Sequence, residues 1–76
     1  MGSELPILHT RDVLRAFARA GYTVLPNRGK GSHIALAAAD HSHVLIVPNH
    51  GDVKRGTLRT LIRQEGMTVE EFRNLL

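Results

Sequence analysis

The feature that most constrains the fold is the stretch from Tyr22 to Pro48, where three short β-forming segments are separated by turn-forming residues. Short segments rich in β-branched and aromatic residues, bounded by Gly, Pro, Asn and Asp, are typical of strands. The segments run from Tyr22 to Leu25, from His33 to Ala38 and from His43 to Val47. Because the connections are short, we expect an antiparallel meander of three strands.

Side-chain alternation in the second segment predicts which residues face the core. Successive residues of a strand point to opposite faces of a sheet. One face therefore carries Ile34, Leu36 and Ala38, and the other carries His33, Ala35 and Ala37. Because the larger apolar side chains must be buried, His33 is expected on the open face of the sheet.

Helical patterns lie on both sides of the strands. Thr10 is a predicted N-cap of a first helix that ends at Gly21, and a second helix follows the third strand and ends at Gly66. Thr68 and Glu71 have the spacing of a capping box that opens a short terminal helix. The order α-β-β-β-α-α predicts an α+β fold: a three-stranded antiparallel sheet, one face covered by helices, plus a short C-terminal helix.

Length and composition limit the architecture. A chain of 76 residues forms one small domain, which we place at residues 10–76, and we expect residues 1–9 to be a disordered leader because they lack periodicity. Cysteine is absent, which excludes disulfides and thiolate metal sites and agrees with a cytoplasmic location. The longest apolar run, Ile34 to Ala39, is far too short for a bilayer, so we expect no membrane association.

Positive charge is concentrated in the body of the chain. The formal net charge is +3, but the segment from Arg11 to Arg63 holds nine Lys or Arg against three acids. A basic central body favours a polyanionic partner, although a solvated surface explains the charge alone equally well.

A glycine-spaced basic loop precedes the second strand. It comprises Arg28, Gly29, Lys30, Gly31 and Ser32, and His33 follows directly. Glycines let a phosphate approach the backbone, lysine supplies positive charge, and imidazole exchanges protons near neutral pH. Taken alone, such a loop is more often an ordinary turn.

A second cationic loop opens the second helix. Lys54 and Arg55 precede the amides of Gly56, Thr57 and Leu58, and a helix N-terminus favours an anion. For one loop alone, the alternative is that Thr57 caps the helix and the two cations lie in water. Two such loops in one small domain favour a shared phosphate backbone as ligand.

The ordered set of these motifs resembles the HicA toxins. The resemblance covers the chain from about Thr10 to its end. It rests on Gly-Ser-His at residues 31–33, Val-Pro-Asn-His at residues 47–50 and Lys-Arg-Gly-Thr-Leu at residues 54–58. It implies a fold like that of double-stranded-RNA-binding domains and the activity of an mRNA interferase, the toxin of a type II toxin–antitoxin system. Many members carry a second histidine after the first, where this chain has Ile34.

The resemblance further implies that His33 is the catalytic histidine, that mRNA is the substrate, and that a HicB antitoxin silences the enzyme. We expect metal-independent cleavage of single-stranded mRNA, in which the ribose 2′-hydroxyl attacks the adjacent phosphate and translation is inhibited. No small-molecule cofactor is implied. His33 then acts as general base or acid, with His50 as a candidate proton-transfer partner. The phosphate is expected to be held by Arg28, Lys30, Lys54 and Arg55.

Three other interpretations follow from the same residues. The chain is alternatively a noncatalytic RNA-binding module in which His33 only donates hydrogen bonds. A metal site from His41, His43 and His50 is a weaker alternative, because zinc takes three or four ligands and no cysteine is present. The third interpretation is compatible with catalysis. In it, an acidic antitoxin surface competes with RNA for the basic face of the chain. Only three aromatic residues are present, which predicts recognition mainly through the backbone.

Overall fold

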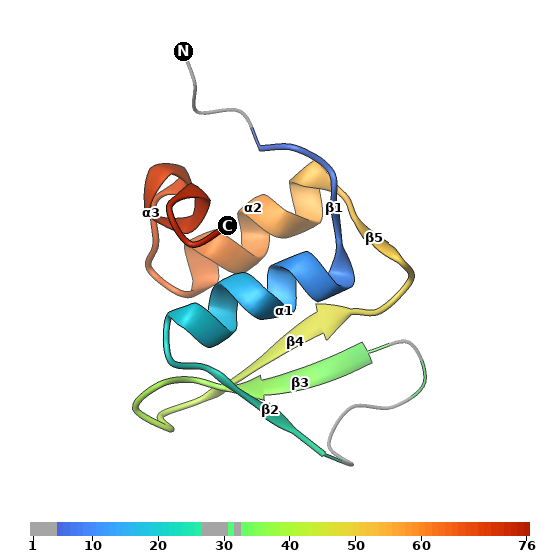
Figure 1. The fold of residues 1–76 in the computed structure, drawn as a ribbon. Helices are drawn as coiled ribbons and strands as arrows, with labels where there is room; N and C mark the ends of the chain where they lie inside the picture. The colour runs from blue at the N-terminus through green and yellow to red at the C-terminus, as the bar shows by residue number, and fades with distance from the viewer. Residues whose placement is uncertain (1–4, 27–30, 32) are drawn as a thin grey trace.

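The three strand segments form one antiparallel sheet in the computed structural model, which describes residues 5–26, 31 and 33–76 (Figure 1). Its strands are β2 (Thr23–Leu25), β3 (His33–Ala37) and β4 (Val44–Pro48), in the order β2-β3-β4. The predicted meander is thereby confirmed, with strand ends within one residue of the prediction.

The register of the sheet fixes its two faces. Leu36 lies opposite Leu45 and Ile34 lies opposite Val47, and residues directly opposite each other share a face. Leu36, Leu45 and Val47 are buried in the core, and Ile34 packs against it. His33 begins β3 and is exposed, consistent with its predicted place on the open face.

Three helices complete the fold: α1 (Thr10–Arg19), α2 (Arg55–Gln64) and α3 (Val69–Arg73). Gly21 is needed after α1 because its φ is +97° and an added Cβ would lie 3.0 Å from the Ala39 side chain. The capping box of Thr68 and Glu71 is present at the start of α3, as predicted. No helix in the described ranges is both long and apolar enough to cross a membrane.

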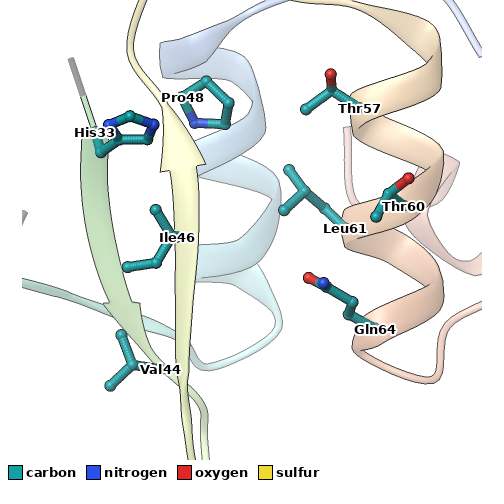
Figure 2. Close-up of a pocket in the computed structure, with 8 residues that line it drawn as sticks. All are labelled: His33, Val44, Ile46, Pro48, Thr57, Thr60, Leu61 and Gln64. Atoms are coloured by element: carbon teal, nitrogen blue, oxygen red, sulfur yellow. The ribbon is translucent and has the colours of Figure 1, made fainter.

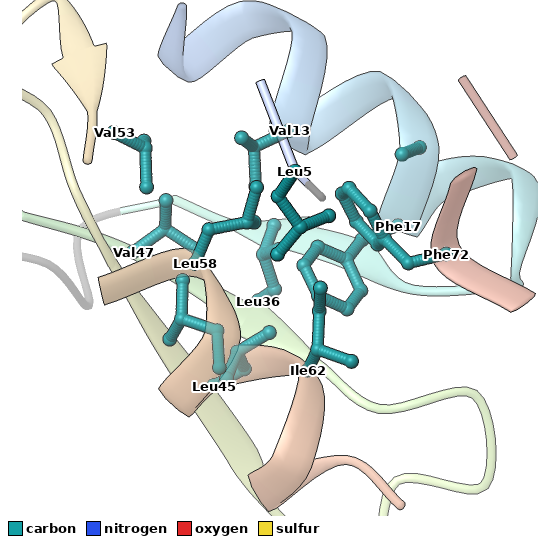
Figure 3. Close-up of a cluster of buried hydrophobic side chains, with 12 residues drawn as sticks. Leu5, Val13, Phe17, Leu36, Leu45, Val47, Val53, Leu58, Ile62 and Phe72 are labelled. Carbon is teal, nitrogen blue, oxygen red and sulfur yellow. The ribbon is translucent and has the colours of Figure 1, made fainter. Parts of the chain in front are cut away.

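The core lies between the sheet and the helices and includes Phe17 (Figure 3). The Phe17 ring is fully buried, with centroid distances of 5.0 Å to Tyr22 and 5.4 Å to Phe72. Leu58 and Ile62 of α2 belong to the same buried cluster. α1 and α2 therefore lie over one face of the sheet, and α3 packs against α2 (Figure 1).

The leader expected at residues 1–9 is part of the packed domain from Leu5 onward. Leu5 is only 1% exposed and belongs to the core. Strand β1 (Leu8–His9) pairs antiparallel with β5 (Asp52–Val53), a two-stranded sheet that the sequence analysis missed. Two-residue strands carry too little alternation to be recognised from sequence, and the burial of Leu5 depends on contacts distant along the chain.

Thr10 does not cap α1 as predicted. His9 occupies the N-cap position, without a side-chain capping bond, and Thr10 is the first helical residue. The hydroxyl of Thr10 instead donates to the carbonyl oxygen of Pro48 at 3.1 Å, and its amide donates to that of Gly51 at 3.0 Å. Thr10 thus ties the start of α1 to the loop after β4.

A polar cluster joins the far end of the sheet to the end of α2. The Tyr22 hydroxyl donates to Oε1 of Glu65, and Nε2 of His43 lies 2.7 Å from the same oxygen. The Glu65 side chain is 2% exposed, and burying a carboxylate costs free energy unless it accepts hydrogen bonds. The contacts with Tyr22 and His43 offset this cost. Burial and the hydrogen bond to Glu65 raise the pKa of Tyr22 above its ordinary value.

Replacing Phe17 with alanine is expected to destabilise the domain strongly. Removing a fully buried phenylalanine side chain typically costs about 3–5 kcal/mol, a large part of the stability of a small domain. The free energy of unfolding should be measured by urea denaturation followed by circular dichroism. Val24→Ala is the control, because Val24 is 50% exposed. This substitution should lower the free energy of unfolding by no more than about 0.5 kcal/mol. Equal losses in the two variants would contradict the central role of Phe17.

Replacing Tyr22 with phenylalanine is expected to change the pH dependence of stability in the alkaline range. The pKa of Tyr22 is raised above 10.0 in the folded protein, so its contribution is complete below pH 10.0 and is lost as pH rises further. Urea denaturation at a series of alkaline pH values should show a steeper loss of stability for the wild type than for Tyr22→Phe. Parallel pH profiles for the two proteins would refute this.

Candidate functional site

The loop after β4 brings a second histidine to His33. His33 lies opposite Pro48 in the sheet, so the chain that leaves β4 passes close to the start of β3. The imidazole centroids of His33 and His50 lie 6.2 Å apart, with the ring planes at 75°. Two imidazoles at this spacing can serve opposite sides of one reacting group as proton donor and proton acceptor.

His33 and His50 line a shared depression, which we call the histidine hollow. It has a volume of about 430 Å³, and its polar lining comprises His33, His50, Asp52, Lys54 and Thr57. Its walls come from the start of β3, the end of β4, the segment after it that includes β5, and the first turn of α2. Four predicted site residues, His33, His50, Lys54 and Thr57, therefore lie together although they are distant in sequence.

The first turn of α2 contributes backbone donors beside this hollow. Lys54 is the N-cap residue and has no side-chain capping bond, so the alternative in which Thr57 caps the helix is wrong. The amide of Leu58 donates to the carbonyl oxygen of Lys54 at 2.8 Å and is not free for a ligand, contrary to expectation. The amides of Gly56 and Thr57 precede this bond and have no partner within the helix.

Arg55 lies apart from its neighbour Lys54. Its Nε donates to the carbonyl oxygen of Leu5 at 2.7 Å. It also lines a different depression, together with Leu5 and Arg73. The structure thus brings Lys54, but not Arg55, to the histidine hollow, because the two side chains diverge at the start of α2.

Asp52 is a residue of the hollow that the sequence analysis did not single out. Its Oδ1 lies 3.1 Å from Nδ1 of His9, and both side chains are exposed. A carboxylate opposes phosphate binding, and the ion pair formed when His9 is protonated weakens that effect. The position of Asp52 in the sequence, between His50 and Lys54, is the signal that could have indicated a place in the site. Its pairing with His9 could not be predicted in this way, because it depends on the pairing of β1 with β5.

Most of the glycine-spaced loop lies outside the described residues. This applies to the predicted phosphate-binding residues Arg28, Gly29, Lys30 and Ser32. Gly31 is described and has a φ of +58°, in the left-handed region that favours glycine. Glycine adopts this backbone conformation without steric cost.

The three histidines considered as metal ligands lie at opposite ends of β4. His41 is in the turn between β3 and β4, and His43 directly precedes β4, whereas His50 follows the strand. His43 also has both ring nitrogens engaged, with Nδ1 2.8 Å from Ser42 Oγ and Nε2 on Glu65. These residues are therefore not assembled into one metal site.

Comparison with known proteins identifies the family. The model described as the HicA toxin of bacterial toxin–antitoxin systems matches residues 10–67, which is most of the 76-residue chain. No significant match was found among curated proteins. The matched region contains α1, the three-stranded sheet, the histidine hollow and α2. The chain belongs to the HicA toxin family of bacterial toxin–antitoxin systems.

Proposed function

We propose that the chain is an mRNA interferase that cleaves single-stranded mRNA without a metal ion. The observation that carries this proposal is the pair of imidazoles, with centroids 6.2 Å apart, in a hollow that also contains Lys54. Membership of the HicA family supports a toxic activity, and the basic body of the chain supports a nucleic-acid substrate. Cleavage of mRNA then inhibits translation.

The two histidines divide the proton transfers between them. One imidazole removes the proton of the ribose 2′-hydroxyl, whose oxygen then attacks the adjacent phosphorus. The other protonates the departing 5′-oxygen of the next nucleotide, and the bond between phosphorus and that oxygen breaks. The products are a 2′,3′-cyclic phosphate and a 5′-hydroxyl end. General acid–base catalysis of this kind typically contributes about 10²- to 10⁴-fold in rate.

The cationic part of the hollow binds the phosphate group. Lys54 supplies a charged donor, and the amides of Gly56 and Thr57 at the start of α2 add neutral ones. Charge that develops on the phosphate oxygens during the attack is stabilised by these groups. Lys30 and Arg28, which precede His33 in the chain, are assigned to the same phosphate backbone. Ser32 is assigned to shaping that loop.

A toxin of this family acts with a cognate antitoxin. We assign this partner to the HicB type and propose that it inhibits by occupying the histidine hollow. An acidic surface would pair with the same cations that attract RNA. Inhibition is then a competition between antitoxin and RNA for one site.

Alanine replacement of either His33 or His50 is expected to lower the cleavage rate by at least about 10²-fold while leaving the fold intact. The reaction uses a labelled single-stranded RNA with excess EDTA, and cleavage is measured at several pH values. A strand with 2′-deoxyribose at the cleaved position should resist the wild type, because the attacking hydroxyl is missing. Wild-type activity should show a bell-shaped pH profile, and each variant should lose one of its limbs.

The matched control is His41→Asn, which removes an exposed histidine at the far end of β4. Asparagine tolerates the positive φ of 59° found at His41, so the turn should be retained. This variant should cleave RNA at the wild-type rate. RNA binding without cleavage by the wild type would replace the proposal with a noncatalytic RNA-binding module, and loss of cleavage in EDTA would overturn metal independence.

Lys54 and Arg55 are expected to differ in their effects on RNA binding although they are adjacent and carry the same charge. Lys54→Gln should weaken binding and lower the slope of log affinity against log salt by about 0.7, the value for one phosphate contact on a single strand. Arg55→Gln should change this slope little and instead lower thermal stability, because the Arg55 side chain holds the Leu5 carbonyl. Equal salt slopes for the two variants would contradict the placement of Lys54 at the phosphate.

A further inference from the structure

A second depression meets the histidine hollow at His33, and we call it the β4 groove. It follows the outer edge of β4 and is closed on the other side by α2 (Figure 2). Val44, Ile46 and Pro48 contribute from the strand, while Leu61 and a row of polar residues project from α2 toward it. His33, Pro48 and Thr57 line both depressions, so the two form one continuous surface.

The two depressions differ in charge. The histidine hollow contains Asp52 and Lys54, whereas no Lys, Arg, Asp or Glu lines the β4 groove in the part of the chain that the structure describes. The floor of the groove is aliphatic, and Ile46 and Val44 remain 46% and 41% exposed. Exposed aliphatic side chains on an edge strand lose unfavourable contact with water when an apolar surface covers them.

The α2 wall of the groove presents neutral hydrogen-bonding groups. Thr57, Thr60 and Gln64 lie on one side of α2, at spacings of three and four residues. The hydroxyl of Thr60 donates to the carbonyl oxygen of Gly56, which leaves its oxygen as an acceptor. The exposed Gln64 amide offers both donors and an acceptor, the combination that reads the edge of a base.

We propose that the β4 groove binds the bases of the nucleotides adjacent to the scissile phosphate, and that Gln64 selects among them. This inference rests on the proposed ribonuclease function, because it takes the phosphate to lie at His33. With the phosphate held in the charged hollow, the neighbouring nucleotide extends into the uncharged groove. Its base packs on Ile46, Val44 and Leu61, and its edge meets the row on α2.

Two observations favour RNA bases over a segment of the antitoxin as the occupant. The groove opens directly onto His33, and its volume of about 480 Å³ lies within the roughly 300–1,000 Å³ typical of small-molecule pockets. Its neutral lining suits bases, whereas the acidic surface expected of the antitoxin is complementary to the charged hollow instead. Single-stranded RNA is commonly recognised through unstacked bases that pack on side chains and are read at their edges.

The test compares two labelled strands of equal length and charge by fluorescence anisotropy. One is a 2′-O-methyl RNA of mixed sequence, which cannot be cleaved, and the other has the same backbone without bases. Gln64→Ala and Ile46→Ala should each bind the base-bearing strand about threefold to tenfold more weakly, as expected for one lost hydrogen bond or apolar contact. Both should bind the abasic strand as the wild type does, whereas Lys54→Gln should weaken binding of both strands.

Matched controls are Asn74→Ala, which removes an exposed amide from the end of α3, and Val24→Ala, which truncates an exposed side chain on the opposite edge strand. Neither control should affect binding of either strand. Mapping of cleavage sites on a long RNA provides a second measurement. Gln64→Ala should cut at altered positions, and its cleavage should still be lost when His33 is also replaced with alanine.

The possible outcomes separate this inference from the proposed function. If the wild type cleaved RNA but both groove variants kept the wild-type affinities and cleavage sites, the assignment of the β4 groove to bases would be wrong. The proposed ribonuclease function would stand. A wild type that neither binds nor cuts RNA would overturn the proposed function, and the groove assignment with it. If the groove variants weakened the complex with the antitoxin but not RNA binding, the occupant would be a protein segment and the inference would be wrong.

Discussion

One face of the three-stranded sheet is buried, because Leu36, Leu45 and Val47 pack in one cluster with Phe17 of α1 and with side chains of α2. The chain has no cysteine, so the fold relies on a small hydrophobic core. All three helices contribute to that core, with Phe17 of α1 and Phe72 of α3 in direct aromatic contact. The depressions that border His33 lie away from this covered face, along the outer edge of β4 and beside the start of α2.

Thr10 connects this core to the candidate site. It is buried at the start of α1, and its hydroxyl and amide hold the carbonyl oxygens of Pro48 and Gly51. These two residues flank His50 on either side in the chain. The position of His50 beside His33 therefore depends on the packing of the first helix, which would hold this loop residue in place for the proposed proton transfer. The pairing of β1 with β5 restrains the same loop.

Under the proposed function, the surface around His33 offers two environments to a single strand of RNA. The histidine hollow contains Lys54 and the start of α2, which suit the phosphate. The β4 groove is neutral and partly apolar, which suits the base. An antitoxin that binds the charged hollow would block the phosphate site without having to match the bases. On this basis, inhibition and sequence preference would depend on different residues.

The three-stranded sheet, the helices, the capping box of α3 and the exposure of His33 could all be predicted from the sequence. These features follow from alternation, helical periodicity and short motifs, which act among residues close in the chain. The sequence did not predict the role of Thr10, the burial of Leu5, the separation of Arg55 from Lys54, or the position of Asp52 beside His33 and His50. Each depends on contacts between segments distant in sequence, and a local pattern carries no information about such contacts. The β4 groove has the same origin, because it exists only where the edge of one strand meets the side of a helix that follows it in the chain.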